Sequence, residues 1–257
     1  MTVTIEGQPA LAFLLASVRI VAWLMVVPPF ASRGMPPMAK VVLSLGLSFA
    51  AAPSLGSSTI AADTWGLLTT VVVQAAIGLA MGFVTSLLFG TVAAAGSLID
   101  VFGGFSLAQG FDPLGMNNST VFGTFHQMLT SALLFVSGGY LLVIGGLLKT
   151  FTLLPIGATP DLHGAQGVLT TAFGLFFVTA VQIALPIVAV LFISDLGLAL
   201  LTKVAPQLQA LSVMFPAKIG LTLLLVGLSF VLLPGVLRNV VDLALEAMAA
   251  MAGGASG

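Results

Sequence analysis

The stretch from Gly96 to Gly123, GSLIDVFGGFSLAQGFDPLGMNNSTVFG, separates two long apolar segments and contains two aspartates, two asparagines, a proline and six glycines. Hydrocarbon cannot satisfy the N–H and C=O groups of polar, glycine-rich backbone, so this stretch must face water, pack inside protein or line a pore. The segments on either side have the composition of helices. The central segment is therefore the first place to look for function.

The composition of the chain indicates an integral membrane protein. Of the 257 residues, 59% are hydrophobic and 6% are charged, and the mean hydropathy is +1.21, whereas a soluble domain carries roughly 25% charged residues. The net charge of −1 gives no indication of a nucleic-acid partner. The absence of cysteine excludes a disulfide framework and thiolate metal sites, and two histidines exclude a histidine-rich metal cluster. Glu6, with no basic residue among the first eight, predicts no cleavable signal.

Six long apolar segments predict an all-α, polytopic membrane-associated protein built from helical hairpins. They are expected at about Pro9–Ala31, Ala39–Ala52, Trp65–Asp100, Val121–Phe151, Val168–Leu201 and Lys218–Met251. The third would be ~54 Å long at 1.5 Å per residue, against a hydrocarbon core of ~30 Å. It must tilt and project beyond the membrane or break in two, and the fourth is also too long for a simple crossing. Pro186 and Pro234 are expected to kink the last two helices.

Small residues recur at every fourth position of the third segment. They are Gly78, Gly82, Ser86, Gly90 and Ala94. Such a stripe lets another helix approach closely. Ordinary packing within one chain is the simplest interpretation, but the pattern does not say whether the neighbouring helix belongs to the same chain.

Arg19 lies inside the first apolar segment. A charge at membrane depth costs at least ~2.5 kcal/mol on insertion scales, so it needs a partner or an aqueous face. Two interpretations stay open: a snorkelling or intramolecularly paired arginine, or a role at a subunit contact.

The basic residues predict an orientation. With six segments, the first, third and fifth loops lie on one side, and their basic residues are Arg33, Lys40, Lys203 and Lys218. The other side has Lys149 and Arg238. The first and fifth loops are therefore expected in the cytoplasm, with both termini outside.

The sequence lacks the spacings of catalytic motifs: it has no HExxH, no GxSxG, no Walker loop and no GxGxxG that opens a helix. Ser131 and His126 could be paired on paper, but any chain of this length offers such a pair, and His126 is more simply a hydrogen-bonded packing residue. Asp100 and Asp195 are the candidate carboxylates for a proton relay. Asp100, at a helix end, is more simply a polar residue that faces the water of the loop. Neither an enzyme nor a cofactor is expected.

Three stretches together resemble one protein family. Residues 19–53 (RIVAWLMVVPPFASRGMPPMAKVVLSLGLSFAAAP) resemble the N-terminal hairpin of FliR, the flagellar export-gate protein. Residues 184–221 (ALPIVAVLFISDLGLALLTKVAPQLQALSVMFPAKIGL) resemble its C-terminal hairpin. The central GSLIDVFGGFSLAQGFDPLG is similar to the signature of that family at Gly96, Asp100, Gly104, Ser106, Ala108, Asp112 and Pro113. By the order and spacing of these three stretches, the chain is identified as a member of the FliR family, which is related to the injectisome SctT family.

The resemblance implies a hetero-oligomeric, non-enzymatic component of the flagellar type III protein export gate. Its place would be the bacterial inner membrane at the base of the flagellum, partly projecting toward the periplasm. The implied partners are FliP-type and FliQ-type subunits, an FlhB-type gate protein and unfolded flagellar substrates. Residues 1–257 would form a single export-gate domain, with a FliP-like part (1–166) that includes a plug loop (105–122), and a FliQ-like hairpin (167–257).

In this family the central loop lies inside the channel and closes it at rest. Carried over, the sealing side chains are Phe105, Leu107, Phe111, Leu114 and Met116. The hinge glycines are Gly103, Gly104, Gly110 and Gly115, and the polar turn residues are Asp100, Asp112 and Pro113. The turn toward the FlhB-type protein would contain Lys203, Pro206, Gln207 and Lys218. Because family members often have large aromatic residues at the positions of Leu107 and Gly110, the seal here is expected to shift to Phe105 and Phe111.

Three other functions are weighed against this one. An injectisome export-gate component that secretes effectors would share the fold. A stand-alone small-molecule permease could use Pro186 and Pro234 as breaks around a site, but these prolines have no counterparts in the first half of the chain. An intramembrane hydrolase lacks a credible nucleophile–base pair.

Overall fold

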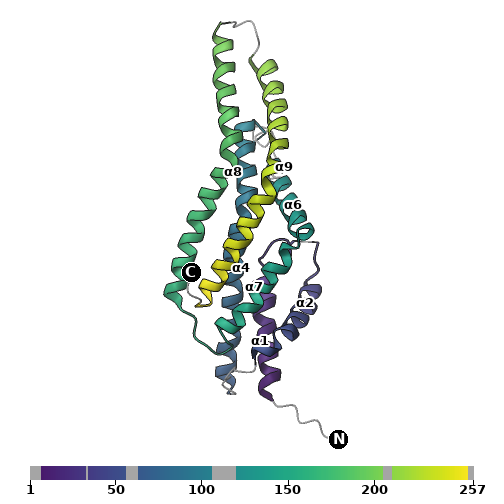
Figure 1. Cartoon of the computed structure of the whole chain (residues 1–257), viewed down its shortest axis with the longest axis vertical. Helices are drawn as coiled ribbons and strands as arrows, with labels where there is room; N and C mark the ends of the chain where they lie inside the picture. The colour runs from purple at the N-terminus through teal and green to yellow at the C-terminus, as the bar shows by residue number, and fades with distance from the viewer. Residues whose placement is uncertain (1–6, 33, 56–62, 106–119, 205–209, 254–257) are drawn as a thin grey trace. The chain divides into compact units, whose positions relative to one another are not determined.

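The computed structural model describes residues 7–32, 34–55, 63–105, 120–204 and 210–253, and the regular structure within these ranges is α-helical (Figure 1). The helices are α1 (Gly7–Leu24), α2 (Pro37–Ala50), α3 (Ala52–Leu55), α4 (Thr64–Gly103), α6 (Val121–Val136), α7 (Gly139–Leu153), α8 (Leu162–Val204) and α9 (Ala210–Met251). The predicted all-α class is confirmed.

The length and composition of the helices fit a polytopic membrane protein. Three helices of the described chain are long and apolar enough to cross a membrane: α4, α8 and residues Phe215–Met251 of α9. The α6–α7 pair passes the same test jointly, although it is bent by 79°. Helices α1 and α2 are apolar but shorter.

The fourth predicted segment is not one helix. It breaks at Gly138, which precedes α7 and has a φ of +74°. Glycine adopts this left-handed conformation at little cost because it has no Cβ. The glycine pair at 138–139 therefore marks a bend between α6 and α7, where the sequence prediction had a continuous helix from Val121 to Phe151.

The ends of the other helices also differ from the prediction. Helix α1 ends at Leu24 and is followed by turns, whereas the first segment was expected to run to about Ala31. Helix α9 already begins at Ala210, so Pro216 lies inside it, and α8 extends to Val204. Pro186 and Pro234 lie inside α8 and α9 without ending them.

The chain divides into two compact units, each made of discontinuous pieces. Unit 1 contains residues 1–88, 135–173 and 240–257, and unit 2 contains residues 89–134 and 174–239. In unit 1, α1 packs against α2 and against the first part of α4, where Gly78 and Gly82 face the backbone of Arg19 and Trp23. The fully buried side chains of unit 1 include Ile20, Trp23, Met81, Leu147 and Phe151.

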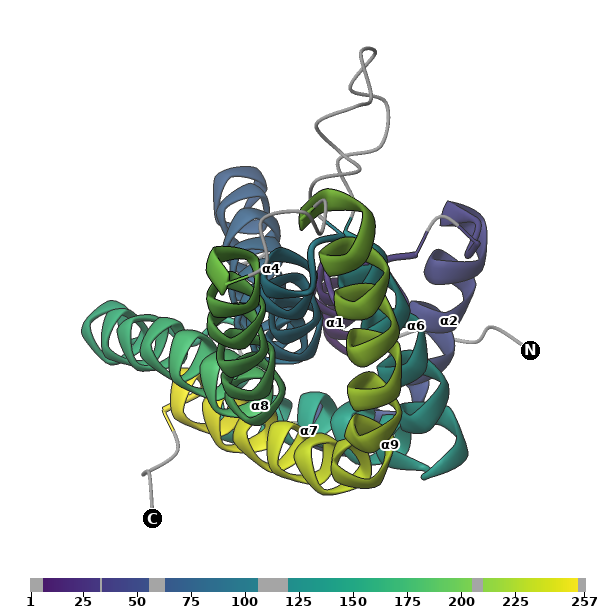
Figure 2. The same cartoon turned by 90° about the horizontal axis from the view of Figure 1, so that it is seen from above.

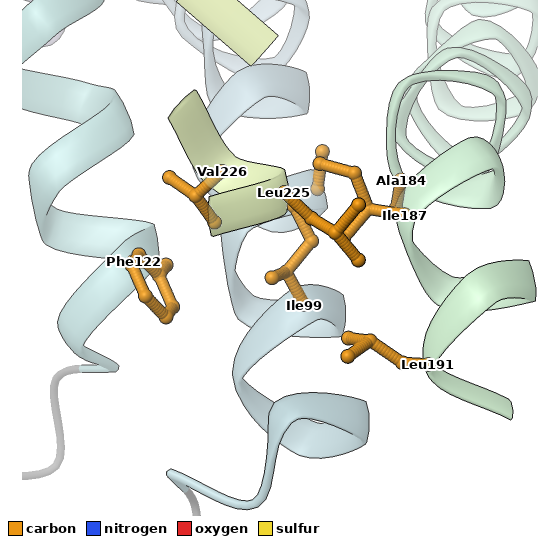
Figure 3. Close-up of a cluster of buried hydrophobic side chains, with 8 residues drawn as sticks. Ile99, Phe122, Ala184, Ile187, Leu191, Leu225 and Val226 are labelled. Carbon is orange, nitrogen blue, oxygen red and sulfur yellow. The ribbon is translucent and has the colours of Figure 1, made fainter. Parts of the chain in front are cut away.

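The core of unit 2 joins four helices around one apolar cluster (Figure 3). Its buried members are Ala95, Ile99, Phe122, Ala184, Ile187, Leu191, Leu225 and Val226. Within this unit, the parts of α8 and α9 run alongside each other in both views (Figures 1 and 2). The cluster therefore packs the end of α4, the start of α6 and parts of α8 and α9 against one another.

Candidate functional site at the base of the central segment

The carboxylate of Asp100, one turn before the end of α4, caps the start of α6. Its Oδ2 accepts hydrogen bonds from the backbone N–H groups of Phe122 (2.9 Å) and Gly123 (3.4 Å). The first N–H groups of a helix have no partner within it, and a negative charge there also interacts favourably with the helix dipole. Asp100 is 0% exposed. The expectation that it faces water is therefore wrong, because the start of α6 encloses its side chain.

The backbone of the same residue ends α4. The C=O of Asp100 accepts a hydrogen bond from the N–H of Phe105 at 3.1 Å, and Gly104 has a φ of +84°. A left-handed glycine followed by this bond is the Schellman arrangement that closes many helices. Asp100 thus binds Phe105, the last described residue before residues 106–119, with its backbone C=O, and it binds the first turn after them with its side chain.

Two glycines bring the backbones of α4 and α6 close enough for this arrangement. A Cβ at Gly96 would lie 2.7 Å from the carbonyl carbon of Phe122 and 2.8 Å from the nitrogen of Gly123. A Cβ at Gly123 would in turn lie 2.6 Å from the Oγ of Ser97. The hydroxyls of Ser97 and Thr120 form a hydrogen bond of 2.7 Å at the same place. The short Asp100 side chain reaches α6 because nothing larger than hydrogen separates the two backbones.

Aromatic rings cover the site from the core side. The rings of Phe105 and Phe122 meet edge to face, with centroids 4.9 Å apart. Phe122 is 5% exposed and belongs to the buried cluster, against which the half-buried Phe105 also packs. The two ends of the predicted plug loop (105–122) are therefore part of the folded core of unit 2.

His126, one turn further along α6, serves packing between helices. Its Nδ1 lies 2.8 Å from the C=O of Phe122, and its Nε2 lies 3.3 Å from the hydroxyl of Ser229 on α9. Because a carbonyl only accepts, Nδ1 is the protonated nitrogen in this contact. Ser131, which could be paired with His126 on paper, does not use its hydroxyl in that way: it donates to the C=O of Gln127. Within the described ranges, no three His, Cys, Asp or Glu residues could jointly hold a metal ion.

Arg19 lies buried in unit 1 and has hydrogen-bond partners in the same chain. Its Nε donates to Oε1 of Gln74 on α4 (2.7 Å), and its Nη2 donates to the C=O of Leu154 (3.0 Å). Its guanidinium also lies over the ring of Phe151, 4.3 Å from the centroid. The interpretation of an intramolecularly paired arginine therefore describes this residue.

Two residues of the small-residue stripe lie against the backbone of another helix. A Cβ at Gly78 would overlap the backbone oxygen of Arg19, and a Cβ at Gly82 would lie 3.2 Å from the backbone oxygen of Trp23. The neighbour is α1 of the same chain. At Gly90 a Cβ would make an ordinary contact of 3.6 Å with Phe176, and Ser86 is half-buried.

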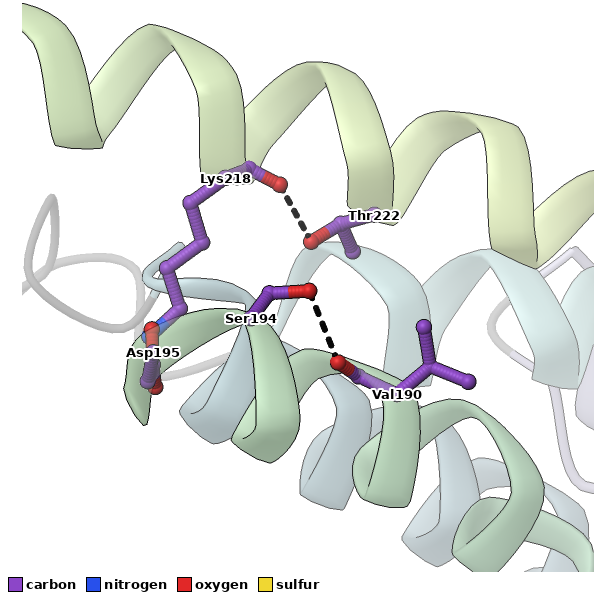
Figure 4. Close-up of polar contacts among 5 residues, drawn as sticks. All are labelled: Val190, Ser194, Asp195, Lys218 and Thr222. Carbon is purple, nitrogen blue, oxygen red and sulfur yellow. Dashed lines mark hydrogen bonds and ion pairs between the residues drawn. The ribbon is translucent and has the colours of Figure 1, made fainter. Parts of the chain in front are cut away.

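The two described residues of the predicted cytoplasmic turn lie on helices. Lys203 is in the last turn of α8, and Lys218 lies inside α9, where its Nζ pairs with Oδ2 of Asp195 at 2.7 Å (Figure 4).

Thr222, which donates to the C=O of Lys218, would lie 2.8 Å from a Cβ at Gly103. Gly103, a predicted hinge, is therefore the last residue of α4 and packs against α9.

Several predicted site residues lie outside the described part of the chain. In the central segment they are Ser106, Leu107, Ala108, Gly110, Phe111, Asp112, Pro113, Leu114, Gly115 and Met116, and in the turn they are Pro206 and Gln207. The structure adds residues that the sequence reasoning missed. These are Ser97, Thr120, Gly123 and Thr222, whose contacts with distant helices gave no signal in the sequence. Phe122 was predicted only as the end of the plug loop.

Comparison with known proteins gives one consistent result. The family described as bacterial export proteins, family 1, matches residues 10–244. The flagellar biosynthetic protein FliR of Escherichia coli K12 is 33% identical over 182 residues, which cover 71% of this chain and 70% of the relative. FliR of Pectobacterium carotovorum is 32% identical over 187 residues, with 71% and 70% covered. FliR of Bacillus subtilis is 28% identical over 194 residues, with 74% of each chain covered.

Proposed function

Because this chain belongs to the bacterial export proteins of family 1, and within them to the FliR family, we propose that it is a non-enzymatic component of the flagellar type III protein export gate. In this role it forms and gates the channel for unfolded flagellar subunits. The relatives whose names are given above are flagellar proteins, which favours the flagellar over the injectisome version of the gate.

One observation carries the gating part of the proposal. Phe105 and Phe122, at the two ends of the predicted plug loop, contact each other and pack into the core of unit 2, and Asp100 bonds to the backbone on both sides. A segment whose two ends are packed together in the core suits a plug, because its base would stay in place while the plug yields to a substrate. The sealing groups would be Phe105, Leu107, Phe111, Leu114 and Met116.

The exposed surface supports an assembly with other membrane subunits. Within unit 2, large apolar side chains of α8 and α9 are exposed, including Phe177 (63%), Leu224 (67%) and Val231 (81%). Large exposed apolar surfaces mark contacts with lipid or with other proteins. We assign these faces to inner-membrane lipid and to FliP-type and FliQ-type subunits at the base of the flagellum, partly on the periplasmic side. The turn between α8 and α9 is assigned to the FlhB-type protein.

The same proposal assigns parts of the chain to parts of the gate. Residues 1–166 would act as a FliP-like part and residues 167–257 as a FliQ-like hairpin of a single export-gate domain. Glycines at 103, 104, 110 and 115 would allow the plug to yield to an unfolded substrate, and Asp112 and Pro113 would shape its turn.

Replacement of residues 106–119 by a short Gly/Ser linker tests the gating role, because Phe105 and Thr120 at the base are kept. Co-purification with tagged neighbouring subunits measures assembly, and ion flux into membrane vesicles measures the leak. The expected result is an assembled but leaky gate, whereas an assembled gate that stays ion-tight would overturn the proposal. Replacement of residues 56–62 by the same linker is the control and should leave the gate tight.

A permease remains the candidate from a different functional class. Its test is transport of small solutes by the purified chain alone in liposomes. The proposed role as a gate component predicts no such transport, since the channel requires the neighbouring subunits.

A further inference from the structure

We propose that Arg19 and Gln74 bind a small monovalent anion, such as chloride, which is enclosed in unit 1 and supplies the counter-charge of Arg19. The residues of the site come from α1, α4 and the end of α7, all within unit 1. The site does not depend on the role of the chain in export, and its test is a property of the chain itself.

Arg19 is a buried cation whose bonds go to neutral groups. The residue is 0% exposed, and arginine keeps its positive charge in proteins. Its acceptors are the amide oxygen of Gln74 and the C=O of Leu154. The ion pair found within the described ranges joins Asp195 and Lys218 in unit 2, and no described carboxylate pairs with Arg19. Because a buried charge is strongly unfavourable unless it is paired, Arg19 calls for a negative group beside it.

Two neighbouring donors at Arg19 also lack an acceptor. Among the described residues, neither Nη1 of Arg19 nor Nε2 of Gln74 has a hydrogen-bond partner. The orientation of the Gln74 amide is fixed, because Nε of Arg19 only donates and Oε1 must therefore face it, which leaves Nε2 as a donor. Trp23, one turn further along α1, adds a third buried donor without a partner, its Nε1. Since buried donors without acceptors are costly, an anion with several lone pairs suits this place.

The surroundings limit the size and the position of the ligand. Arg19, Trp23 and Gln74 are all fully buried, so a lipid headgroup or a side chain of another subunit cannot reach them without opening the core. The ring of Phe151 covers one face of the guanidinium, 4.3 Å from the centroid to Cζ. The anion is therefore expected at the edge of the guanidinium, where Nη1 donates, and a single positive charge is balanced by a monovalent ion.

The first measurement is the dependence of thermal unfolding on chloride. The full chain, purified in detergent, is transferred from sodium chloride to sodium gluconate at the same ionic strength, because gluconate is too large to be enclosed. Added chloride should raise the unfolding temperature in a saturable way, by about 5–10 °C at a hundredfold excess over its dissociation constant. An unfolding temperature that does not respond to chloride would overturn the proposal, and a neutral acceptor such as water would then satisfy the donors.

Substitution of Gln74 assigns the response to this site. Q74E places a carboxylate oxygen where Oε1 of the amide lies, 2.7 Å from Nε of Arg19, and removes the Nε2 donor. This internal counter-charge should replace the anion. Q74E should therefore unfold at the same temperature in chloride and in gluconate, and in gluconate it should be more stable than the unmodified chain, which separates the result from a loss of folding.

The matched control is Q127E, the same substitution at an exposed position of α6. It leaves the surroundings of Arg19 unchanged, so it should keep the full response to chloride. A Q74E chain that responds to chloride as strongly as Q127E does would overturn the proposal, because the anion would then bind elsewhere.

Bromide locates the ion directly. It should replace chloride in crystals of the full chain, and its anomalous scattering should give a peak within hydrogen-bonding distance of Nη1 of Arg19 and Nε2 of Gln74. Crystals of Q74E should lack this peak. Bromide found only at the surface of the unmodified chain would contradict an enclosed site at Arg19, even if chloride stabilises the protein.

Discussion

Phe105 and Phe122, seventeen positions apart in the sequence, meet edge to face with their ring centroids 4.9 Å apart and their planes at 74°. They mark the points where the chain leaves α4 and enters α6. Edge-to-face pairs of this kind contribute ~0.5–1.5 kcal/mol beyond the burial of their surface. The contact therefore ties the two ends of the central segment to the apolar cluster of unit 2.

Truncation of Phe122 should destabilise unit 2 strongly. F122A is expected to cost ~3–5 kcal/mol, the usual range for loss of a buried aromatic ring, because Phe122 is 5% exposed in the core. F105A should cost less, since its ring is only half-buried. The fraction of assembled gate that survives heating measures the effect. V136A on the same helix is the control, since Val136 is 86% exposed; equal losses for V136A and F122A would contradict the assigned core.

A methyl group at Gly78 should be poorly tolerated. Its Cβ would overlap the backbone oxygen of Arg19, so α1 would have to move away from α4, at a cost of ~1–3 kcal/mol for overpacking. G145A is the matched control, because a Cβ there meets nothing within 4 Å in this chain and alanine favours helix by ~1 kcal/mol over glycine. Yields of folded protein should fall for G78A and hold for G145A. The reverse order would mean that α1 does not pack on this face.

The stability of unit 1 should depend on the shape of the Arg19 side chain as well as on its charge. R19K is expected to reduce stability, because one ammonium group cannot reproduce the separate bonds to Gln74 and Leu154 and the stacking on Phe151. Q74L should also destabilise, since it leaves a buried charged donor without its acceptor. Thermal inactivation of the assembled gate is the measurement.

The double variant R19M/Q74L tests whether these two residues act as a pair. Replacement of both polar partners by apolar groups of similar size can be nearly neutral where loss of one is costly. The double variant should therefore lose less stability than the sum of R19M and Q74L. Strict additivity would show that Arg19 and Gln74 are not coupled, and that the essential partner of Arg19 lies elsewhere.

The sequence predicts the regular parts of this molecule better than the places where distant segments meet. Apolar length identified the long helices, and the small residues at Gly78 and Gly82 predicted a close helix contact, because both signals are local. The break at Gly138 was missed, since a glycine inside an apolar run is compatible with both a straight and a bent helix. Asp100 was expected in water, because a lone carboxylate at a helix end gives no indication that another helix will start against it.

The partners of Arg19 also could not be predicted, because they are distant from it in the sequence. A buried charge demands an acceptor, and the sequence left open whether that acceptor belongs to the chain. Gln74 and the C=O of Leu154 are far from Arg19 in the sequence. Because every residue has a main-chain carbonyl, the sequence cannot indicate which carbonyl accepts the bond. The resemblance of three stretches identified the family, but it predicted none of these non-local contacts.

The two histidines should separate a structural role from a catalytic one. His163 is exposed, so H163A should change neither assembly nor export. His126 is fully buried and bonds to Phe122 and Ser229, so H126A should lower the amount of assembled gate by leaving a cavity and unpaired groups. If the chain acts as proposed, the complexes that do assemble should export at the normal rate, because the imidazole of His126 bonds to Phe122 and to Ser229 on α9. Export per assembled gate, measured as secreted flagellar subunit against co-purified chain, is the deciding quantity. Abolition of export in normally assembled H126A gates would reopen the case for a chemical function.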